Sequence, residues 1–225
     1  MNIIEQKLIE AQEKAKNLFK IIEERNLICS GKTEKEINTE IYELAFELYG
    51  IKKYWHKRIV RAGKNTLFPY RENPPNLLIK QNDIVFLDFG PVFEDWEADF
   101  GRTFVLGNDH FMIKLQADIM LAFDEGKKYF NSRSNITGGE LYYFVKSLAA
   151  KYSWEFGHVH CGHLIGKFPH EKVEDHEVNS YLHPDNKYDL KSVNSNGLKK
   201  HWILEIHFVD RQREIGGFTE ELLTI

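Results

Sequence analysis

The chain has 225 residues, 42% of them hydrophobic and 13% aromatic, which is typical of a globular protein and excludes a disordered chain. Its formal net charge of −4 at pH 7 provides no basic surface for nucleic acid or an anionic membrane, so we expect neither as a partner. Two cysteines, a charged N-terminus and the lack of an apolar run of roughly 20 residues predict a cytoplasmic protein without disulfide framework, signal peptide or membrane span.

Four amphipathic helices are predicted from apolar residues that recur at intervals of three and four positions. Their capping residues are, in chain order, Asn2 with Glu5, Thr33 with Glu36, Asn108 or Asp109, and Thr137 with Glu140. The first helix is expected over residues 2–25, and the second is expected to end at Gly50, because glycine readily adopts the conformation that ends a helix. A strand is expected over residues 53–63, before a connection that contains several prolines.

Acidic residues lie within two strand-like runs between residues 83 and 104. Asp88 follows four large apolar residues, 84–87, that favour a buried strand, and Asp99 lies in the return segment. If the chain turns at residues 93–95, positions whose numbers sum to 187 are paired, and Asp88 faces Asp99 with Cβ atoms roughly 5 Å apart. Two buried carboxylates at this distance repel each other, and one pKa rises unless a cation lies between them. This hairpin therefore predicts a metal site.

The C-terminal part of the chain repeats this arrangement. Residues 202–209 and 218–225 are predicted strands, and each contains acidic residues within an apolar run. A turn centred on Gln212 and Arg213 pairs positions whose numbers sum to 425 and places Glu205 opposite Glu220, with Glu221 as the alternative. Two helices and an acidic hairpin thus occur twice, which predicts a fold of two pseudo-symmetric halves.

Between the two hairpins, residues 157–171 are rich in His and Gly, so four carboxylates and a histidine are expected to converge. A ligand set with more oxygen than nitrogen suits two divalent ions about 3.5 to 4 Å apart, with Mn, Co, Fe and Zn all open. Four negative charges balance two such ions, and water held between them would become a nucleophile near neutral pH, so hydrolysis is the expected reaction. Structural roles are favoured for His158 and His160, with the substrate pocket as the alternative.

Four motifs carry a resemblance to a known superfamily. They are Asp88-Phe-Gly, Asp99-Phe-Gly-Arg-Thr-Phe104, Cys161-Gly-His-Leu-Ile-Gly-Lys-Phe-Pro-His-Glu171 and Leu204-Glu-Ile206. From about Trp55 to its end, the chain resembles the methionine aminopeptidase and Xaa-Pro peptidase superfamily, whose α+β fold is called pita-bread. The resemblance implies a single catalytic domain over residues 1–225, in which helices pack on a curved antiparallel sheet.

The resemblance also implies roles for individual residues. The five implied metal ligands are Asp88, Asp99, His163, Glu205 and Glu220. His170 is implied to contact the substrate carbonyl, and Glu205 is implied to carry a proton from the bridging water to the leaving amine. The implied enzyme is a dinuclear metallo-aminopeptidase that removes an N-terminal residue from Xaa-Pro or other short peptides. A non-catalytic pita-bread binding module is the alternative, and an oligomeric state stays open.

The chain departs from the family pattern at several positions. Residues 65–70 lack a histidine that family members usually have there, and His56 is a nearby histidine. Leu164 occupies a position where the family often has glycine, which is expected to narrow the pocket and leaves the substrate open. Glu97 is expected to be solvated beside the turn, and residues 172–201 are expected to form a polar surface loop near the site.

Overall fold

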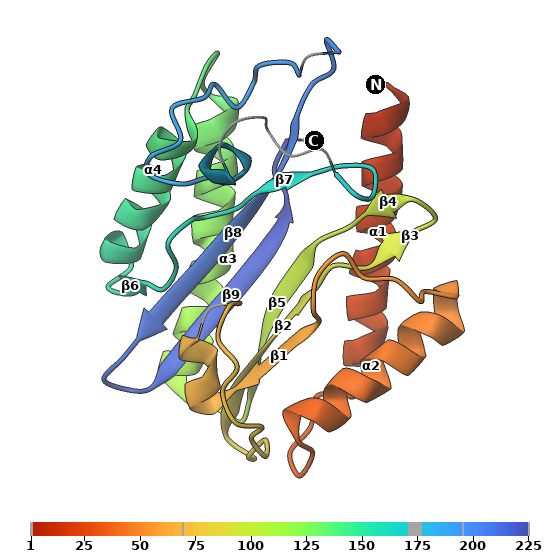
Figure 1. Cartoon of the computed structure of the whole chain (residues 1–225). Coiled ribbons are helices and arrows are strands. Elements are labelled where there is room, and N and C mark those ends of the chain that lie inside the picture. The colour runs from red at the N-terminus through yellow and green to blue at the C-terminus, as the bar shows by residue number, and fades with distance from the viewer. Residues whose placement is uncertain (1, 69, 171–176, 195, 225) are drawn as a thin grey trace.

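A seven-stranded antiparallel sheet forms the centre of the molecule (Figure 1). The computed structural model describes residues 2–68, 70–170, 177–194 and 196–224. The strand order is β1-β2-β5-β9-β8-β6, β7 also pairs with β8, and β3 and β4 form a separate two-stranded sheet. The strands are β1 (Ile59–Ala62), β2 (Asp83–Phe89), β3 (Val92–Phe93), β4 (Trp96–Glu97), β5 (Phe100–Leu106), β6 (Glu155–Phe156), β7 (Leu164–Ile165), β8 (His201–Asp210) and β9 (Ile215–Leu222).

Two pairs of helices lie against the two halves of this sheet (Figure 1). The helices are α1 (Ile3–Glu24), α2 (Glu34–Tyr49), α3 (His110–Asn131) and α4 (Gly138–Lys151), with short 3₁₀ helices η1 (Gly63–Leu67) and η2 (Glu177–Ser180). The first pair packs with the half that contains β1, β2 and β5, and the second pair packs with β6, β8 and β9. Each half has its own hydrophobic core, which confirms the predicted α+β fold of two halves.

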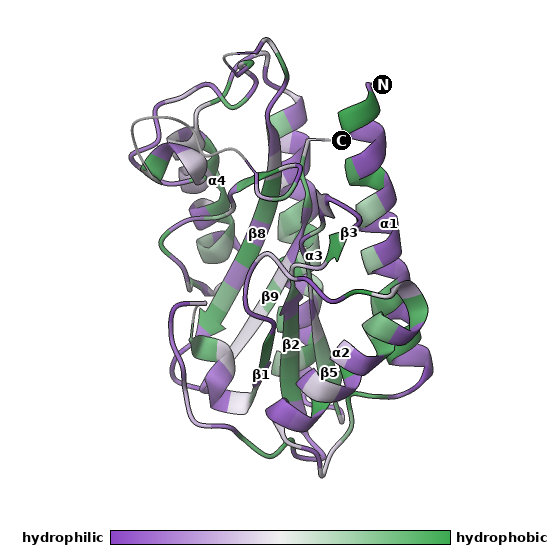
Figure 2. Ribbon diagram, turned by 45° about the vertical axis from the view of Figure 1, so that its right-hand side comes forward, coloured by the Kyte–Doolittle hydropathy of each residue, from purple (hydrophilic) through white to green (hydrophobic). Residues whose placement is uncertain are grey.

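The helices begin where the sequence predicts them. Asn2, Thr33 and Thr137 form the expected capping boxes, and Asp109 caps α3. Gly50 ends α2 with a φ of 65°, in the left-handed region that favours glycine. Figure 2 shows green apolar and purple polar residues alternating along α1, as expected for an amphipathic helix that covers a sheet. None of the helices in the described residues is long and apolar enough to cross a membrane.

The register predicted for the first acidic hairpin is wrong by two residues. Asp88 pairs with Gly101, so the numbers of paired positions sum to 189. The turn consists of Glu94 and Asp95, one position later than the predicted centre. Because side chains alternate with a period of two, this shift leaves the acids on their predicted face. Asp99 lies two residues before Gly101 and is therefore the diagonal neighbour of Asp88.

The second acidic hairpin has the predicted register, with Glu205 opposite Glu220. The two hairpins meet where Gly101 of β5 pairs with Glu220 of β9. Side-chain hydrogen bonds extend this seam, because Thr103 Oγ1 donates to the Phe218 carbonyl and accepts from the Phe218 N–H, both at 2.7 Å. The predicted acids thus lie at the junction of the two halves.

The strand predicted over residues 53–63 is wrong in its first part, because β1 contains only Ile59–Ala62. Residues 53–58 instead cross the connection after β2, where the Trp55 N–H donates to the Gly90 carbonyl at 3.0 Å. A side chain at Gly90 would lie 2.3 Å from atoms of both Trp55 and His56. Gly90 therefore allows these two rings to reach the inner face of the sheet.

The polar loop predicted over residues 172–201 is partly buried. Residues 172–176 and 195 lie outside the described part of the chain. In the remainder, Leu182 and Leu190 are fully buried in the core that α3 and α4 share. The Leu190 carbonyl also accepts a hydrogen bond from the Trp202 indole at 2.9 Å. Local polarity predicts a surface loop, but these two leucines anchor the segment to the core.

Candidate metal centre

One cavity of about 340 Å³ brings together all five predicted metal ligands. Asp88 and Asp99 come from the first half of the chain, and the second half supplies His163, Glu205 and Glu220. Their exposed fractions range from 2% to 8%. Four acids and a histidine from both halves therefore face one small, mostly buried space.

His163 is held in an orientation suited to metal binding. Its Nδ1 lies 2.7 Å from the Leu164 carbonyl, which can only accept a hydrogen bond, so Nδ1 carries the proton. Its Nε2 lies 2.9 Å from Asp99 Oδ2 and 3.6 Å from Glu205 Oε1. A histidine fixed by a backbone carbonyl in this way presents its other nitrogen to a metal.

Burial makes the ionised form of three of these carboxyl groups unfavourable. Burial, together with the neighbouring carboxylates and against the opposing charges of the nearby histidines, raises the pKa of Asp88 to about 6 and the pKa of Glu205 to about 8. The pKa of Glu220 rises well above its ordinary value through burial and through the charges of Asp99, Asp88 and Glu205. In the metal-free protein, protons therefore reduce the repulsion among these acids.

Asp99 is the acid that stays ionised. Burial opposes ionisation, but His56 and His163 outweigh it and lower the pKa of Asp99 to about 2. Burial likewise opposes the charged form of each imidazole, yet the acids raise the pKa values of His56 and His163 to about 9. Divalent cations would replace these protons as the positive charges of the site.

Ligand atoms of the described residues gather in three groups that could each hold a cation. His56, Asp88 and Asp99 place one ligand atom each within 4.8 Å of one another, and so do Asp99, His163 and Glu220, as well as His158, His160 and Glu205. Asp99 belongs to the first two groups and is therefore the candidate for a carboxylate shared between two ions. Glu220 Oε1 is buried and makes no hydrogen bond within the described residues, and Asp88 Oδ1 has only the ion-pair contact with His56 Nε2 at 3.4 Å, so both oxygens are available to a cation.

Strand alternation distinguishes Glu220 from Glu221. Glu220 is 2% exposed and lines the cavity, whereas Glu221 points to the other face of β9. There the Glu221 carboxylate accepts a hydrogen bond from Arg102 and lies 3.2 Å from Lys16 Nζ. The structure therefore places Glu220, and not its neighbour, in the site.

The structure adds His56 to the site. Its Nε2 lies 3.1 Å from Asp99 Oδ1 and 3.4 Å from Asp88 Oδ1, and its Nδ1 lies 2.7 Å from the Lys57 carbonyl. The sequence alone shows His56 only as a histidine near residues 65–70 and does not place it in the site. The irregular path of residues 53–58 is a tertiary feature that the local sequence pattern does not contain.

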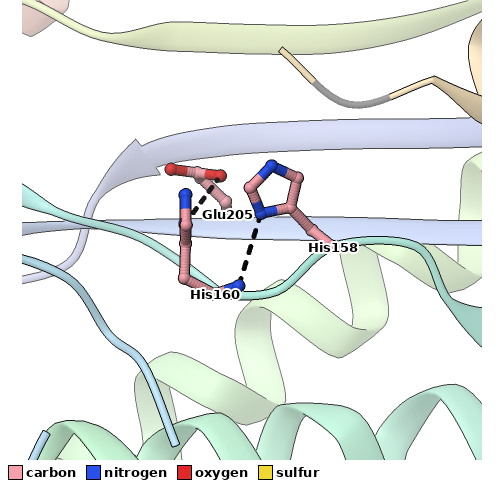
Figure 3. A group of neighbouring side chains, drawn as sticks. All are labelled: His158, His160 and Glu205. Atoms are coloured by element: carbon pink, nitrogen blue, oxygen red, sulfur yellow. Dashed lines mark hydrogen bonds and ion pairs between the residues drawn. The ribbon is translucent and has the colours of Figure 1, made fainter. Parts of the chain in front are cut away.

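His158 and His160 line the cavity beside Glu205 (Figure 3). This position corresponds to the substrate-pocket role, which the sequence favoured less than a structural role. His160 Nδ1 is 3.7 Å from Glu205 Oε2, and His158 Nδ1 accepts a hydrogen bond from the His160 N–H at 3.3 Å. Burial lowers the pKa values of both imidazoles, to about 3 for His158. Both rings are therefore neutral at pH 7, and because His158 Nδ1 is an acceptor, the proton of that ring lies on Nε2, which can donate a hydrogen bond.

His170 also lines the cavity, and its partner is unexpected. Glu97 was expected to be solvated, but it is only 1% exposed, and its Oε2 lies 2.7 Å from His170 Nδ1. Trp55 packs against His163 and His170, and its ring centroid lies 4.9 Å from that of His163 and 5.5 Å from that of His170. The turn position of Glu97 suggested exposure, whereas the segment after β7 covers it.

Comparison with known proteins places these features in a family. The model of metallopeptidase family M24 matches residues 6–198. The Xaa-Pro dipeptidase of Pyrococcus horikoshii is 28% identical over 145 residues, which are 64% of this chain and 40% of that protein. An uncharacterized peptidase of Methanocaldococcus jannaschii is 30% identical over 168 residues, which are 74% of this chain and 45% of that protein. The chain therefore spans less than half the length of these relatives.

Solved structures share the fold. The Xaa-Pro dipeptidase from Bacillus anthracis matches with a TM-score of 0.77 at 20% identity, covering 100% of this chain and 61% of that chain. Methionine aminopeptidase from Rickettsia prowazekii matches with a TM-score of 0.71 at 17% identity, covering 100% of both chains. These similarities confirm the pita-bread fold that the sequence motifs imply.

Proposed function

The chain belongs to metallopeptidase family M24, and on this premise we propose that it is a dinuclear metal-dependent amide hydrolase, specifically an aminopeptidase acting on short peptides. The observation that carries the proposal is the convergence of four buried carboxylates and a histidine in one cavity. The proposed ligands are Asp88, Asp99, His163, Glu205 and Glu220, which all line the cavity, around two ions of Mn, Co, Fe or Zn. Bound there, the ions would lower the pKa of a water molecule and polarise the scissile carbonyl.

The protein's own residues would move the protons. With ions bound, Glu205 would be ionised, and it would accept a proton from the attacking water and then return it to the leaving amine. His170 lines the same cavity, where its imidazole would hold the carbonyl oxygen of the substrate. Most of the site is buried, so bulk water is largely excluded and these interactions are strengthened.

The cavity favours a small substrate. A volume of about 340 Å³ is near the lower end for ligand pockets, and it suits the end of a peptide better than a folded chain. Aromatic rings of Trp55, Phe86 and Phe218 line it beside the acids, which provides apolar surface for a substrate side chain. Relatives named Xaa-Pro dipeptidase and Xaa-Pro aminopeptidase support an Xaa-Pro peptide, with other short peptides as the wider class.

The proposal extends to the organisation of the protein. Residues 1–225 would act as a single catalytic domain in the cytoplasm, with a small peptide as partner and with no part for nucleic acid or membrane. The net charge of −4 supports the lack of a role for nucleic acid or membrane, because it provides no attraction for polyanions.

A peptide panel with a matched pair of variants tests the function. Purified protein is supplied with Mn, Co, Fe or Zn and assayed on Xaa-Pro dipeptides, longer Xaa-Pro peptides and N-terminal Met peptides. Glu220→Gln is expected to abolish hydrolysis and reduce bound metal. Glu221→Gln is expected to retain both, because that carboxylate pairs with Arg102 on the other face of the strand.

Two results would overturn the proposal. Wild-type protein that carries two ions but hydrolyses no peptide would exclude the peptidase. Protein that takes up no metal, with a thermal stability that Glu220→Gln leaves unchanged, would favour a non-catalytic binding module.

A further inference from the structure

Glu97 is a buried carboxylate next to the cavity, outside the set of predicted metal ligands. It lies in β4, is 1% exposed, and accepts three hydrogen bonds from the segment after β7. The His170 N–H donates to Oε1 at 3.1 Å, and His170 Nδ1 and the Gly166 N–H lie 2.7 and 3.3 Å from Oε2. One side chain therefore binds both the backbone and the ring of His170.

The backbone around Glu97 fixes the same segment independently. The Glu97 N–H donates to the Gly166 carbonyl at 3.2 Å, and the Phe168 N–H donates to the Asp95 carbonyl at 2.7 Å. Trp96 and Lys167 form an isolated β-bridge between these contacts. The loop is thus held by main-chain bonds, and the Glu97 side chain is not needed merely to close it.

The ring contact selects one form of the imidazole. An ionised carboxylate only accepts hydrogen bonds, so the proton between Glu97 and His170 belongs on Nδ1 of the histidine. Trp55 packs edge-on against the ring at a centroid distance of 5.5 Å, and its own Nε1 donates to the Ala98 carbonyl at 3.2 Å. With Nδ1 engaged and the ring plane set by Trp55, Nε2 is the nitrogen left for a ligand in the cavity.

We propose that Glu97 is a positioning residue that keeps the Nδ1 proton on His170 and thereby directs Nε2 to the substrate. Whether the His170 ring is neutral or charged, its Nδ1 keeps the proton and donates it in a hydrogen bond to Glu97. The ring therefore exchanges a hydrogen bond or a proton with the substrate at Nε2. The kinetic part of this inference rests on the proposed peptidase function. The tautomer part does not.

Nitrogen NMR of the histidine rings tests the tautomer directly. Chelator-treated protein labelled with ¹⁵N-histidine is compared with His170→Gln, whose missing signals identify those of His170. The neutral ring of His170 is expected to be protonated at Nδ1 in the wild type, and Glu97→Gln is expected to increase the Nε2–H form. Asp95→Asn is the matched control, because its carboxylate is 66% exposed in the same turn, and it is expected to leave the tautomer unchanged.

A double-mutant cycle tests the function of the pair. Glu97→Gln is expected to lower kcat by about 10- to 100-fold with little change in KM, as for other residues that orient a catalytic side chain. In a His170→Ala background, the same substitution is expected to change kcat/KM by less than about twofold, because the two residues act as one unit. Asp95→Asn is expected to retain wild-type kinetics.

Specific results would overturn the inference. An Nε2–H tautomer for His170 in the wild type would contradict it even if Glu97→Gln fails to fold. Equal effects of Glu97→Gln with and without His170 would show that Glu97 acts on the structure in general. An inactive wild type with the expected tautomer would contradict the peptidase function but leave the positioning role of Glu97 intact.

Discussion

Removal of metal ions is expected to reverse the pH dependence of this protein's stability between pH 6.5 and pH 8. The raised pKa of Glu205, about 8, means that the folded metal-free protein retains a proton that an unfolded carboxyl group, with its pKa near 4.5, has already lost. Stability from this group is therefore full below pH 4.5 and is lost as the pH rises toward 8. His56 and His163, whose pKa values are raised from 6.5 to about 9, act in the same direction above pH 6.5.

The magnitude follows from one proton. Each extra proton in the folded state lowers the free energy of unfolding by about 1.4 kcal/mol per pH unit, so Glu205 alone accounts for about 2 kcal/mol between pH 6.5 and pH 8. In a chain of 225 residues, this corresponds to a decrease in Tm of about 4 to 8 °C. His158 and His207, whose pKa values are lowered to about 3 and 4, oppose this trend only below about pH 6.5, so the chosen window largely excludes them.

Thermal unfolding with and without metal is the assay. Chelator-treated protein is expected to lose stability as the pH rises, and protein saturated with Mn²⁺ is expected to gain it, because metal binding requires deprotonated ligands. Glu205→Gln is the control variant. It is expected to reduce the pH dependence of the free energy of unfolding of the metal-free protein by the contribution of about one proton. A metal-free protein at least as stable at pH 8 as at pH 6.5 would refute the reasoning, as would a slope that Glu205→Gln leaves unchanged.

Three further substitutions probe the site. Gly101→Ala would place a Cβ 2.6 Å from the Phe218 ring and 3.0 Å from Glu220 Cγ. We expect the free energy of unfolding to fall by about 1 to 3 kcal/mol in thermal melts and the bound metal to decrease in elemental analysis. Unchanged values would contradict this close packing. His56→Gln is expected to destabilise the metal-free protein by about 3 kcal/mol through the unpaired acids, and the metal-saturated protein by less; equal losses would argue against this pairing. Asp99→Asn is expected to abolish binding of both ions in a metal titration, whereas two retained ions would exclude a shared ligand.

The sequence predicts the features that depend on nearby residues. Capping at Asn2 and Thr33 fixes where helices begin, because the cap and its partner are three residues apart. The pairing of Glu205 with Glu220 follows from one short turn. An acidic residue within an apolar strand also predicts a metal site, because burial of a charge is unfavourable without a partner of opposite charge.

Features that depend on distant contacts were missed. Glu97 lies beside a turn, where solvent exposure is usual, but the segment after β7 covers it. His56 reaches the acids because Gly90, more than thirty positions away in the chain, leaves space for its ring. The register of the first hairpin depended on a turn position that the polar residues around Glu94 did not define.

The site also explains how the two halves are joined. Asp88 and Asp99 belong to one half, and the other predicted ligands belong to the second, so metal ions bound to them would cross-link the halves where Gly101 pairs with Glu220. When the ions are absent, burial and then the charges of Asp99 and Asp88 oppose the ionisation of Glu205 and raise its pKa. A cluster that destabilises the metal-free fold and would bridge its halves once ions bind would serve function at the expense of intrinsic stability. Metal binding and folding of the central seam are therefore expected to be coupled.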